Sequence, residues 1–285
     1  MFQFFSQNLI VKQNSPVFLY LCASLLFLSM GQAQATLLTP PVYEGTASFN
    51  TMSHGGGYSS AHNEYWYPQW SGTLITRYDS NYNPIGTFNS PVEQIMQLWG
   101  EQDGSYYTAN WSFENINHIA GMNDNTINWT YDLGNTASGV TADDNFVYAM
   151  DNSHNKVHKL DKNTGTLIEM FLIDTPEVLT LTYGGLFVVD DFLFRVDQNA
   201  NVIQHSLIDH SVTHFNFNDI AGSSTSSVYN LSFNGTQVLY SDNSNTTSHV
   251  FTMSTASDIP EPSVIVLMGL GLLGFSVTRY KPKKH

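Results

Sequence analysis

The chain has little cysteine and little positive charge. Its single cysteine is Cys22, which excludes an intramolecular disulfide framework. Only 10 of its 285 residues are Lys or Arg, against 24 Asp and Glu, and the formal net charge is -14. An acidic surface of this kind repels nucleic acid and other polyanions, so it argues against DNA or RNA as a partner.

Helical periodicity and one catalytic motif are also missing from the long middle part of the chain. No stretch there repeats its apolar residues with the spacing of an amphipathic helix. His54-Gly55-Gly56-Gly57 matches the oxyanion-loop pattern of lipases and esterases. The Gly-x-Ser-x-Gly pentapeptide that must accompany that loop is absent. We therefore expect the glycines to form a flexible surface loop, and we assign no catalytic residue.

The N-terminal end predicts a signal peptide over residues 1–35. Lys12 precedes an apolar core at residues 17–28, and Ala33-Gln34-Ala35 follows it as a small-x-small cleavage pattern. Signal peptidase is expected to cut after Ala35. The exported chain would then have no cysteine, because Cys22 lies inside the removed segment.

The C-terminal end, residues 259–285, has three parts in a fixed order. The triplet Pro260-Glu261-Pro262 comes first, an apolar run follows at residues 264–277, and the end is basic, with Arg279, Lys281, Lys283 and Lys284. With its flanks the run approaches the about 17–25 apolar residues that can span a bilayer. The basic cluster predicts a cytoplasmic C-terminus for the precursor in the inner membrane. A permanent single-pass anchor and a processed signal both fit.

This order of proline triplet, apolar span and basic tip resembles the PEP-CTERM sorting signal of Gram-negative bacteria. The resemblance implies that an exosortase recognises and processes the tail at Pro260, Glu261 and Pro262. It implies transient anchoring by the C-terminal helix, followed by a location at the cell surface or outside the cell. It also implies that the protein belongs to bacteria that make exopolysaccharide and biofilm.

Residues 36–258 are expected to fold as one all-β domain. Short strands of alternating apolar and polar residues end at Asn110, Asp151, Asp190 and Asp242, with spacings of roughly forty to fifty residues, as in propeller blades. We predict a small β-propeller of about five blades, with a strand at Thr46–Asn50 closing the ring. A β-sandwich is the alternative.

The turn Asp161-Lys-Asn-Thr-Gly165 lies between two of these strands. In its pattern of strand, turn, Asp-x-x-Thr-Gly and strand, the domain diffusely resembles the β-propeller repeat families of secreted bacterial proteins. The resemblance implies the same fold and names no ligand.

Aromatic residues suggest a place where a ligand could bind. Trp66 and Trp70 lie in the dense stretch Tyr65–Trp70, and aromatic rings beside Asn, Gln and Asp suit stacking on sugars. Packing between blades is the competing interpretation, because strands are rich in Tyr and Trp. We take Trp66 and Trp70 as guesses for ligand-binding residues.

The histidines and acidic turns give no metal site or cofactor. His154 with His158, and the trio His205, His210 and His214, lie in strand and turn contexts where their spacing loses its helical meaning. Asp151-Asn-Ser and Asp242-Asn-Ser lack the late bidentate Glu of a calcium loop, and Asx-turns explain them better. Weak calcium binding by such turns is left open, without ligands.

Two functions remain open from the sequence. The first is a non-enzymatic surface or extracellular-matrix protein that binds exopolysaccharide or a protein partner. The alternative is a secreted hydrolase or lyase that acts on polysaccharide, with two carboxylates near the propeller mouth.

Overall fold

A computed structural model of the chain describes residues 40–49, 55–173, 185–224, 228–242 and 247–253. The chain divides into two compact units, 1–36 and 37–285, and all described residues lie in the second. The signal-peptide and sorting segments predicted above lie outside the described residues. Within the described ranges, no helix is both long enough and apolar enough to cross a membrane.

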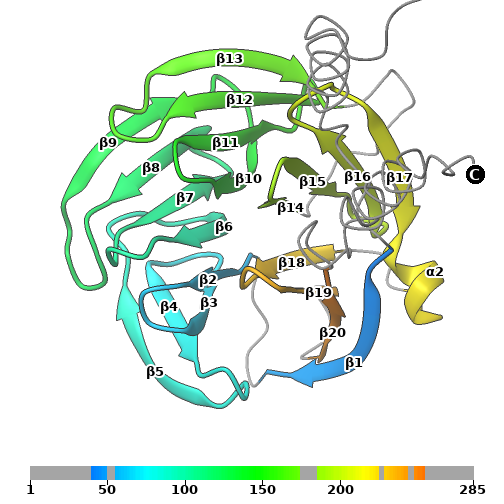
Figure 1. Ribbon diagram of the computed structural model, residues 1–285. Helices are drawn as coiled ribbons and strands as arrows, with labels where there is room; N and C mark the ends of the chain where they lie inside the picture. The colour runs from blue at the N-terminus through cyan, green and yellow to red at the C-terminus, as the bar shows by residue number, and fades with distance from the viewer. Residues whose placement is uncertain (1–39, 50–54, 174–184, 225–227, 243–246, 254–285) are drawn as a thin grey trace, which may run out of the picture. The chain divides into compact units, whose positions relative to one another are not determined.

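The described residues form a β-propeller of five four-stranded blades (Figure 1). In the first four blades the chain runs through each blade from the innermost to the outermost strand. Blade 1 is β2 (Gly57–Ser59), β3 (Glu64–Pro68), β4 (Leu74–Tyr78) and β5 (Pro84–Asn89). Blade 2 is β6 (Ile95–Gly100), β7 (Tyr106–Asn110), β8 (Asn115–Ile119) and β9 (Ile127–Asp132).

The remaining blades follow the same order until the last, which both ends of the domain build. Blade 3 is β10 (Ala137–Ala142), β11 (Phe146–Asp151), β12 (Lys156–Asp161) and β13 (Leu167–Leu172). Blade 4 is β14 (Gly185–Val189), β15 (Phe192–Val196), β16 (Asn201–Ser206) and β17 (Val212–Asn216), followed by the short helix α2 (Phe217–Ala221). Blade 5 is β18 (Val228–Phe233), β19 (Gln237–Asp242), β20 (Thr247–Thr252) and β1 (Val42–Ser48).

The ring is closed by β1, which is the outermost strand of blade 5. It pairs antiparallel with β20, from Val42 opposite Thr252 to Ser48 opposite Thr247. The predicted all-β propeller is confirmed, with an N-terminal closing strand that begins four residues earlier than the predicted Thr46. The innermost strands of neighbouring blades contact one another all round the ring.

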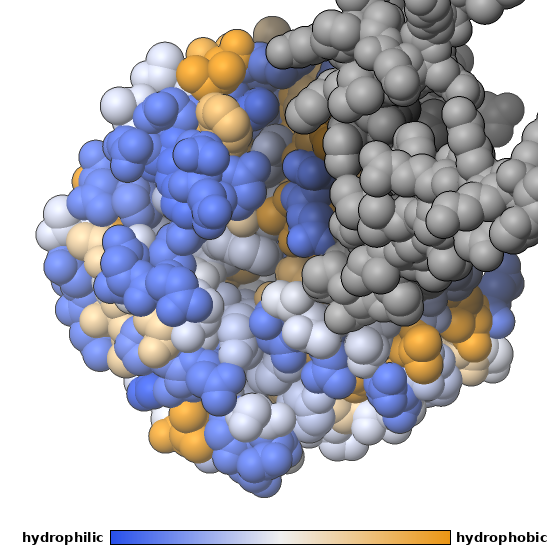
Figure 2. Space-filling model, in the orientation of Figure 1, coloured by the Kyte–Doolittle hydropathy of each residue, from blue (hydrophilic) through white to orange (hydrophobic). Residues whose placement is uncertain are grey.

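The core lies between the blades, and most of its largest fully buried side chains are aromatic. Trp66 packs against Phe88 and Tyr106 between blades 1 and 2, while Phe217 packs against Tyr240 and Phe251 beside blade 5. Such fully buried large side chains each contribute roughly 1.5–3 kcal/mol of burial free energy. The outer strands face solvent, and Figure 2 shows hydrophilic residues over most of the described part of one face.

The prediction of a flexible surface loop is wrong for Gly55, Gly56 and Gly57, because these glycines lie inside the propeller. These residues are buried, and Gly56 accepts a 3.0 Å hydrogen bond from the Leu98 N–H. A Cβ on Gly57 would lie only 2.3 Å from the Leu98 carbonyl oxygen. Glycine is therefore needed because the backbones of blades 1 and 2 meet here in parallel pairing.

The predicted repeat register is right in three blades and wrong in one. Asn110, Asp151 and Asp242 each end the second strand of their blade, whereas Asp190 follows the innermost strand β14. Its φ of 50° places Asp190 in the tight turn to β15. The error arises because an apolar run followed by Asp looks the same in an innermost strand as in a second strand.

Candidate functional site

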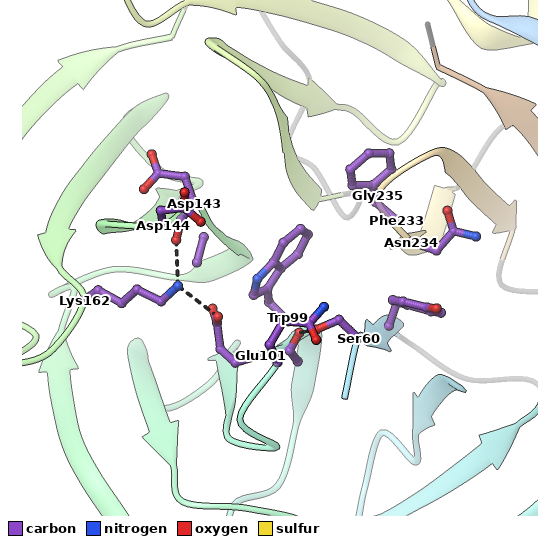
Figure 3. Close-up of a pocket in the computed structure, with 13 residues that line it drawn as sticks. Ser60, Trp99, Glu101, Asp143, Asp144, Lys162, Phe233, Asn234 and Gly235 are labelled. Atoms are coloured by element: carbon purple, nitrogen blue, oxygen red, sulfur yellow. Dashed lines mark hydrogen bonds and ion pairs between the residues drawn. The ribbon is translucent and has the colours of Figure 1, made fainter. Parts of the chain in front are cut away.

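A pocket of about 260 Å³ lies at one end of the propeller axis (Figure 3). Its walls come from the ends of the innermost strands β2, β6, β10 and β18, from the turns that follow them, and from the β12–β13 turn. Four of the five blades therefore meet at it. We call it the axial pocket, lined by residues that include Ser60, Trp99, Glu101, Asp143, Asp144, Lys162, Phe233, Asn234 and Gly235.

Asp and Asn side chains fix the turns that carry these residues. Asp103 accepts a hydrogen bond from the Ser105 N–H at 2.9 Å, and Asp143 accepts from the Asn145 and Phe146 N–H groups, both at 2.7 Å. In blade 5, Asn234 binds the Thr236 and Gln237 N–H groups in the same way. These Asx-turns hold the rim of the pocket in one conformation.

An ion pair crosses the pocket wall from blade 2 to blade 3. Lys162 Nζ lies 2.8 Å from Glu101 Oε2 and donates to the Asp143 carbonyl oxygen at 2.7 Å. Trp129 anchors the backbone of Lys162, because its indole N–H donates to the Lys162 carbonyl oxygen at 3.2 Å. The Glu101 carboxylate and the Asp143 carbonyl oxygen therefore hold the ammonium group, and Trp129 holds the backbone of the same residue.

Glu101 has an unusual environment for a carboxylate. Its side chain is 15% exposed, and its Oε1 atom is buried without a hydrogen-bond partner among the described residues. Burial raises the pKa of Glu101 above its ordinary value, and hydrogen bonding from Lys162 and from the Trp99 side chain offsets that rise only in part. A buried acceptor with free capacity is the kind of group that a ligand could satisfy.

Asp143 and Asp144 differ in how many hydrogen bonds their side chains make with the protein. Both carboxylate oxygens of Asp143 accept hydrogen bonds from the protein, including one from the Tyr148 hydroxyl at 2.8 Å. Asp144 is exposed, and its side chain has no hydrogen bond or ion pair with the described residues. Asp143 therefore shapes the turn, while Asp144 is available to a ligand.

Aromatic rings form the apolar side of the axial pocket. Trp99 and Phe233 stand with their ring centroids 6.4 Å apart and their planes at 23°, and Phe187 packs on Phe233 from blade 4 at 5.0 Å. Phe233 is buried, whereas Trp99 is half-buried. Part of the Trp99 indole is therefore open to the pocket.

His118 lies behind the ion pair, packed between Tyr107 and Trp129. Both of its ring nitrogens are buried without a partner in the described part of the chain. Burial lowers the pKa of His118, an effect that the Asp103 charge opposes and the Lys162 charge adds to. A neutral imidazole there keeps further positive charge away from the pocket.

The two tryptophans expected to bind a ligand lie elsewhere. Trp66 is fully buried at 0% exposure and donates to Glu64 Oε2 at 3.1 Å, so its ring has no face open to a ligand. This contradicts the guess for Trp66 and agrees with packing between blades. Trp70 lies half-buried in the β3–β4 turn, outside the axial pocket.

The other predicted site residues divide into two groups. The signal-cleavage residues Ala33 and Ala35 lie outside the described residues, as do the sorting residues Pro260, Glu261, Pro262, Arg279, Lys281, Lys283 and Lys284. Three histidines that the sequence singled out, His154, His205 and His210, have local partners instead. His154 pairs with Asp151 at 2.8 Å, and His205 contacts His210 at 3.2 Å.

The described ranges contain no group of three or more His, Cys, Asp or Glu side chains placed to hold a metal ion. Asp151 forms the expected Asx-turn, since its Oδ1 accepts from the Ser153 N–H at 3.0 Å. The side chain of Asp242 is not among those described.

Sequence reasoning missed Trp99, Glu101 and Lys162. Lys162 lies within the recognised Asp161–Gly165 turn, and Glu101 lies two residues before Asp103. The signal that could have found them is the recurrence of turn-forming Asp or Asn after innermost strands, because those turns gather at one end of a propeller.

Comparison with known proteins identifies the C-terminal segment. Residues 258–279 match the PEP-CTERM protein-sorting motif, which confirms the resemblance drawn from the proline triplet, the apolar run and the basic tip. The motif marks an exported protein that is anchored at its C-terminus, processed by an exosortase and delivered to the cell surface. No match to this chain was found among curated protein sequences.

Two solved structures that align with this chain are distant from it in sequence. A glutaminyl cyclase from Myxococcus xanthus aligns with a TM-score of 0.54 and 9% identity, over 75% of this chain and 98% of that one. BamB from Moraxella catarrhalis aligns with a TM-score of 0.44 and 10% identity, over 70% of this chain and 85% of that one. At such identities the likeness concerns the fold alone.

Proposed function

We propose that residues 36–258 form a non-enzymatic protein of the cell surface or extracellular matrix that binds exopolysaccharide in the axial pocket. Signal peptidase would remove residues 1–35, and an exosortase would process the tail at Pro260-Glu261-Pro262. The basic residues Arg279–Lys284 would stay with the removed piece. The observation that carries the proposal is the pocket itself, where four blades bring an aromatic ring and uncommitted polar groups together.

The chemistry of the pocket suits a sugar. A pyranose ring presents apolar C–H faces that stack on an indole, and hydroxyl groups that need donors and acceptors. Trp99 supplies the ring, while the exposed Asp144 carboxylate supplies acceptors. The Ser60 hydroxyl donates a hydrogen bond to the Gly100 carbonyl oxygen, with 3.1 Å between the two oxygens. The Ser60 oxygen can therefore still accept a hydrogen bond.

Binding is favoured over catalysis because of how the carboxylates are engaged. Glycoside hydrolysis needs a pair of carboxyl groups, one acting as acid and one as base or nucleophile. Asp143 is saturated by three protein hydrogen bonds, and Glu101 Oε2 is held by Lys162. Only Asp144 has both of its oxygens uncommitted.

The alternative function is a secreted hydrolase or lyase, and one observation favours it. Burial raises the pKa of Glu101, and a raised pKa is what a carboxylic acid needs to donate a proton near neutral pH. Glu101 would then be the acid and Asp144 the second carboxylate.

One experiment separates the two functions. The 36–258 domain is titrated with oligosaccharides from the exopolysaccharide of its own cells, and binding is measured by calorimetry while released reducing ends and unsaturated products are assayed. We expect binding without product release. Product release that Glu101→Gln abolishes would establish the enzyme instead.

Matched tryptophan variants test whether the axial pocket is the binding site. Trp99→Ala should weaken binding about fivefold or more, since stacking on one aromatic ring is worth on the order of 1 kcal/mol. Trp70→Ala is the control and should bind normally. Equal loss in both variants, or loss only in Trp70→Ala, would place the site elsewhere.

The sorting step is tested in the native cells by intact mass and location. The mature protein should lack both residues 1–35 and everything after the proline triplet, and it should be found at the cell surface. Deleting the exosortase should leave a longer form that keeps Arg279–His285 in the inner membrane. A permanent anchor predicts the longer form in both strains.

A further inference from the structure

The axial pocket has more negative than positive charge. The carboxylates of Glu101, Asp143 and Asp144 face the single ammonium group of Lys162, so three negative charges against one positive leave a formal charge of -2. The whole chain has the same sign, at -14. Negative potential from both sources attracts cations toward this end of the propeller.

Lys162 offsets only one of the three carboxylates, because it forms an ion pair with Glu101. Its Nζ lies 2.8 Å from Glu101 Oε2 and 2.7 Å from the Asp143 carbonyl oxygen. Glu101 Oε1, on the same carboxylate, has no partner. A ligand cation could therefore bind the exposed Asp144 carboxylate without displacing Lys162.

The aromatic side of the pocket favours the same kind of ligand. A cation placed over the face of a Trp or Phe ring is attracted to the negative face of the π-system, and tryptophan is the strongest such partner. Trp99 is half-buried and stands 6.4 Å from Phe233. An indole beside carboxylates recognises an ammonium group better than a neutral hydroxyl.

The size of the pocket limits what carries that ammonium group. At about 260 Å³ it falls just below the roughly 300–1,000 Å³ of pockets that enclose drug-sized ligands. One sugar unit fits such a space, with the rest of a chain outside it. Glu101 and the aromatic rings would contact that single unit.

We propose that the axial pocket selects a sugar unit with a protonated amine, that is, a deacetylated amino sugar of a polysaccharide. The inference rests on the proposed function and names its ligand class. The amine binds the Asp144 carboxylate, the Glu101 carboxylate adds negative charge to the pocket, and the sugar ring stacks on Trp99.

Calorimetry measures the affinity of the 36–258 domain for four short ligands. They are a glucosamine oligosaccharide, the same oligosaccharide fully N-acetylated, a neutral glucose oligosaccharide and a lysine tripeptide. Short oligomers are used because a long polycation would bind any acidic protein. We expect the glucosamine oligosaccharide to bind at least about tenfold more tightly than its acetylated form, a factor that corresponds to about 1.4 kcal/mol.

Variants assign the selectivity to the pocket. Asp144→Asn and Glu101→Gln should each lower the affinity for the glucosamine oligosaccharide more than the affinity for its acetylated form, so that the preference for the amine falls several-fold. Glu169→Gln is the matched control, since it removes one exposed carboxylate from the outer strand β13 and should keep the full preference. Asp144 is exposed, and its side chain makes no hydrogen bond or ion pair with the described residues, so we expect its variant to fold even if Glu101→Gln does not.

Each other outcome overturns the inference in a distinguishable way. Equal affinity for amine and acetylated sugars would refute amine selection and leave polysaccharide binding intact. Binding of the lysine tripeptide without the sugars would assign the pocket to a protein partner. Binding of none would remove the proposed function as well, and an equal loss in Glu169→Gln would show only nonspecific attraction.

Discussion

The side chain of Gln97 binds both backbone groups of Leu186. Its Nε2 donates to the Leu186 carbonyl oxygen at 2.6 Å, and its Oε1 accepts from the Leu186 N–H at 2.9 Å. The same Oε1 accepts from the Val140 N–H at 2.9 Å. One buried amide on blade 2 thus ties together the innermost strands of blades 2, 3 and 4, close to the axis that carries the candidate site.

Replacing Gln97 by Leu should destabilise the propeller strongly. Three buried backbone groups would lose their partner, and each such loss costs about 1–3 kcal/mol, so we expect the free energy of unfolding to fall by roughly 3 kcal/mol or more. Urea unfolding measures it. Gln69→Ala, at an exposed position, is the control and should change little; equal stability of both variants would contradict the account.

Replacing Gly57 by Ala should push blades 1 and 2 apart. The new Cβ would lie 2.3 Å from the Leu98 carbonyl oxygen, a backbone atom that cannot turn aside. We expect a loss of at least about 1–3 kcal/mol from overpacking, read as a lower thermal midpoint. In Gly72→Ala the nearest atom is the flexible Gln69 side chain at 3.4 Å, so that variant should keep its midpoint.

Replacing Glu64 by Gln should destabilise the protein at neutral pH. Burial alone would raise the pKa of Glu64, but hydrogen bonds from Arg77 and Trp66 outweigh it and hold the pKa below its ordinary value. Stability from a lowered carboxyl pKa is present above the ordinary pKa of 4.5 and is lost as the pH falls through the folded value.

The difference between wild type and Glu64→Gln should therefore be largest near pH 7 and shrink in acid. Denaturant unfolding at several pH values measures it, with the exposed Glu114→Gln as control. A difference that stays constant from pH 7 down to strong acid would mean that the Arg77 ion pair is not its cause.

His205 should make the protein less stable in mild acid. Burial and then the neighbouring His210 lower the pKa of His205 from its ordinary 6.5. The unfolded chain therefore binds more protons than the folded one, so stability present above pH 6.5 falls as the pH drops toward the folded value.

The variant His205→Asn should show a flatter fall of stability between pH 6.5 and pH 5 than wild type. The fall should persist in part, because burial also lowers the pKa of His118 and His158. His214→Asn, at an exposed position, is the control. Identical pH profiles for wild type and His205→Asn would remove His205 as a contributor.

The sequence predicted those features of the fold that depend on local pattern. The alternation of apolar and polar residues with a period of two marks strands, and turn residues mark where they end, so the all-β propeller and its N-terminal closing strand were within reach. The same local information could not tell an innermost strand from a second strand. That is why Asp190 was placed one strand out of register.

The aromatic residues show the same limit. Trp66 and Trp99 look alike in a sequence, since each lies within a short strand, β3 and β6 respectively. In the folded protein Trp66 is enclosed by Phe88 and Tyr106, while Trp99 faces a pocket. Burial depends on which neighbours arrive from other blades, and no sequence spacing encodes that directly.

The sequence by itself determined the sorting motif at residues 258–279, because such a sorting signal consists of prolines, apolar residues and basic residues in one contiguous segment. Only the tertiary structure decided that Glu101 and Lys162, sixty-one positions apart in the sequence, form an ion pair beside Trp99. The physical reason is closure of the ring, which brings turns from four separate blades to one end of a common axis, where none of them alone could form a site.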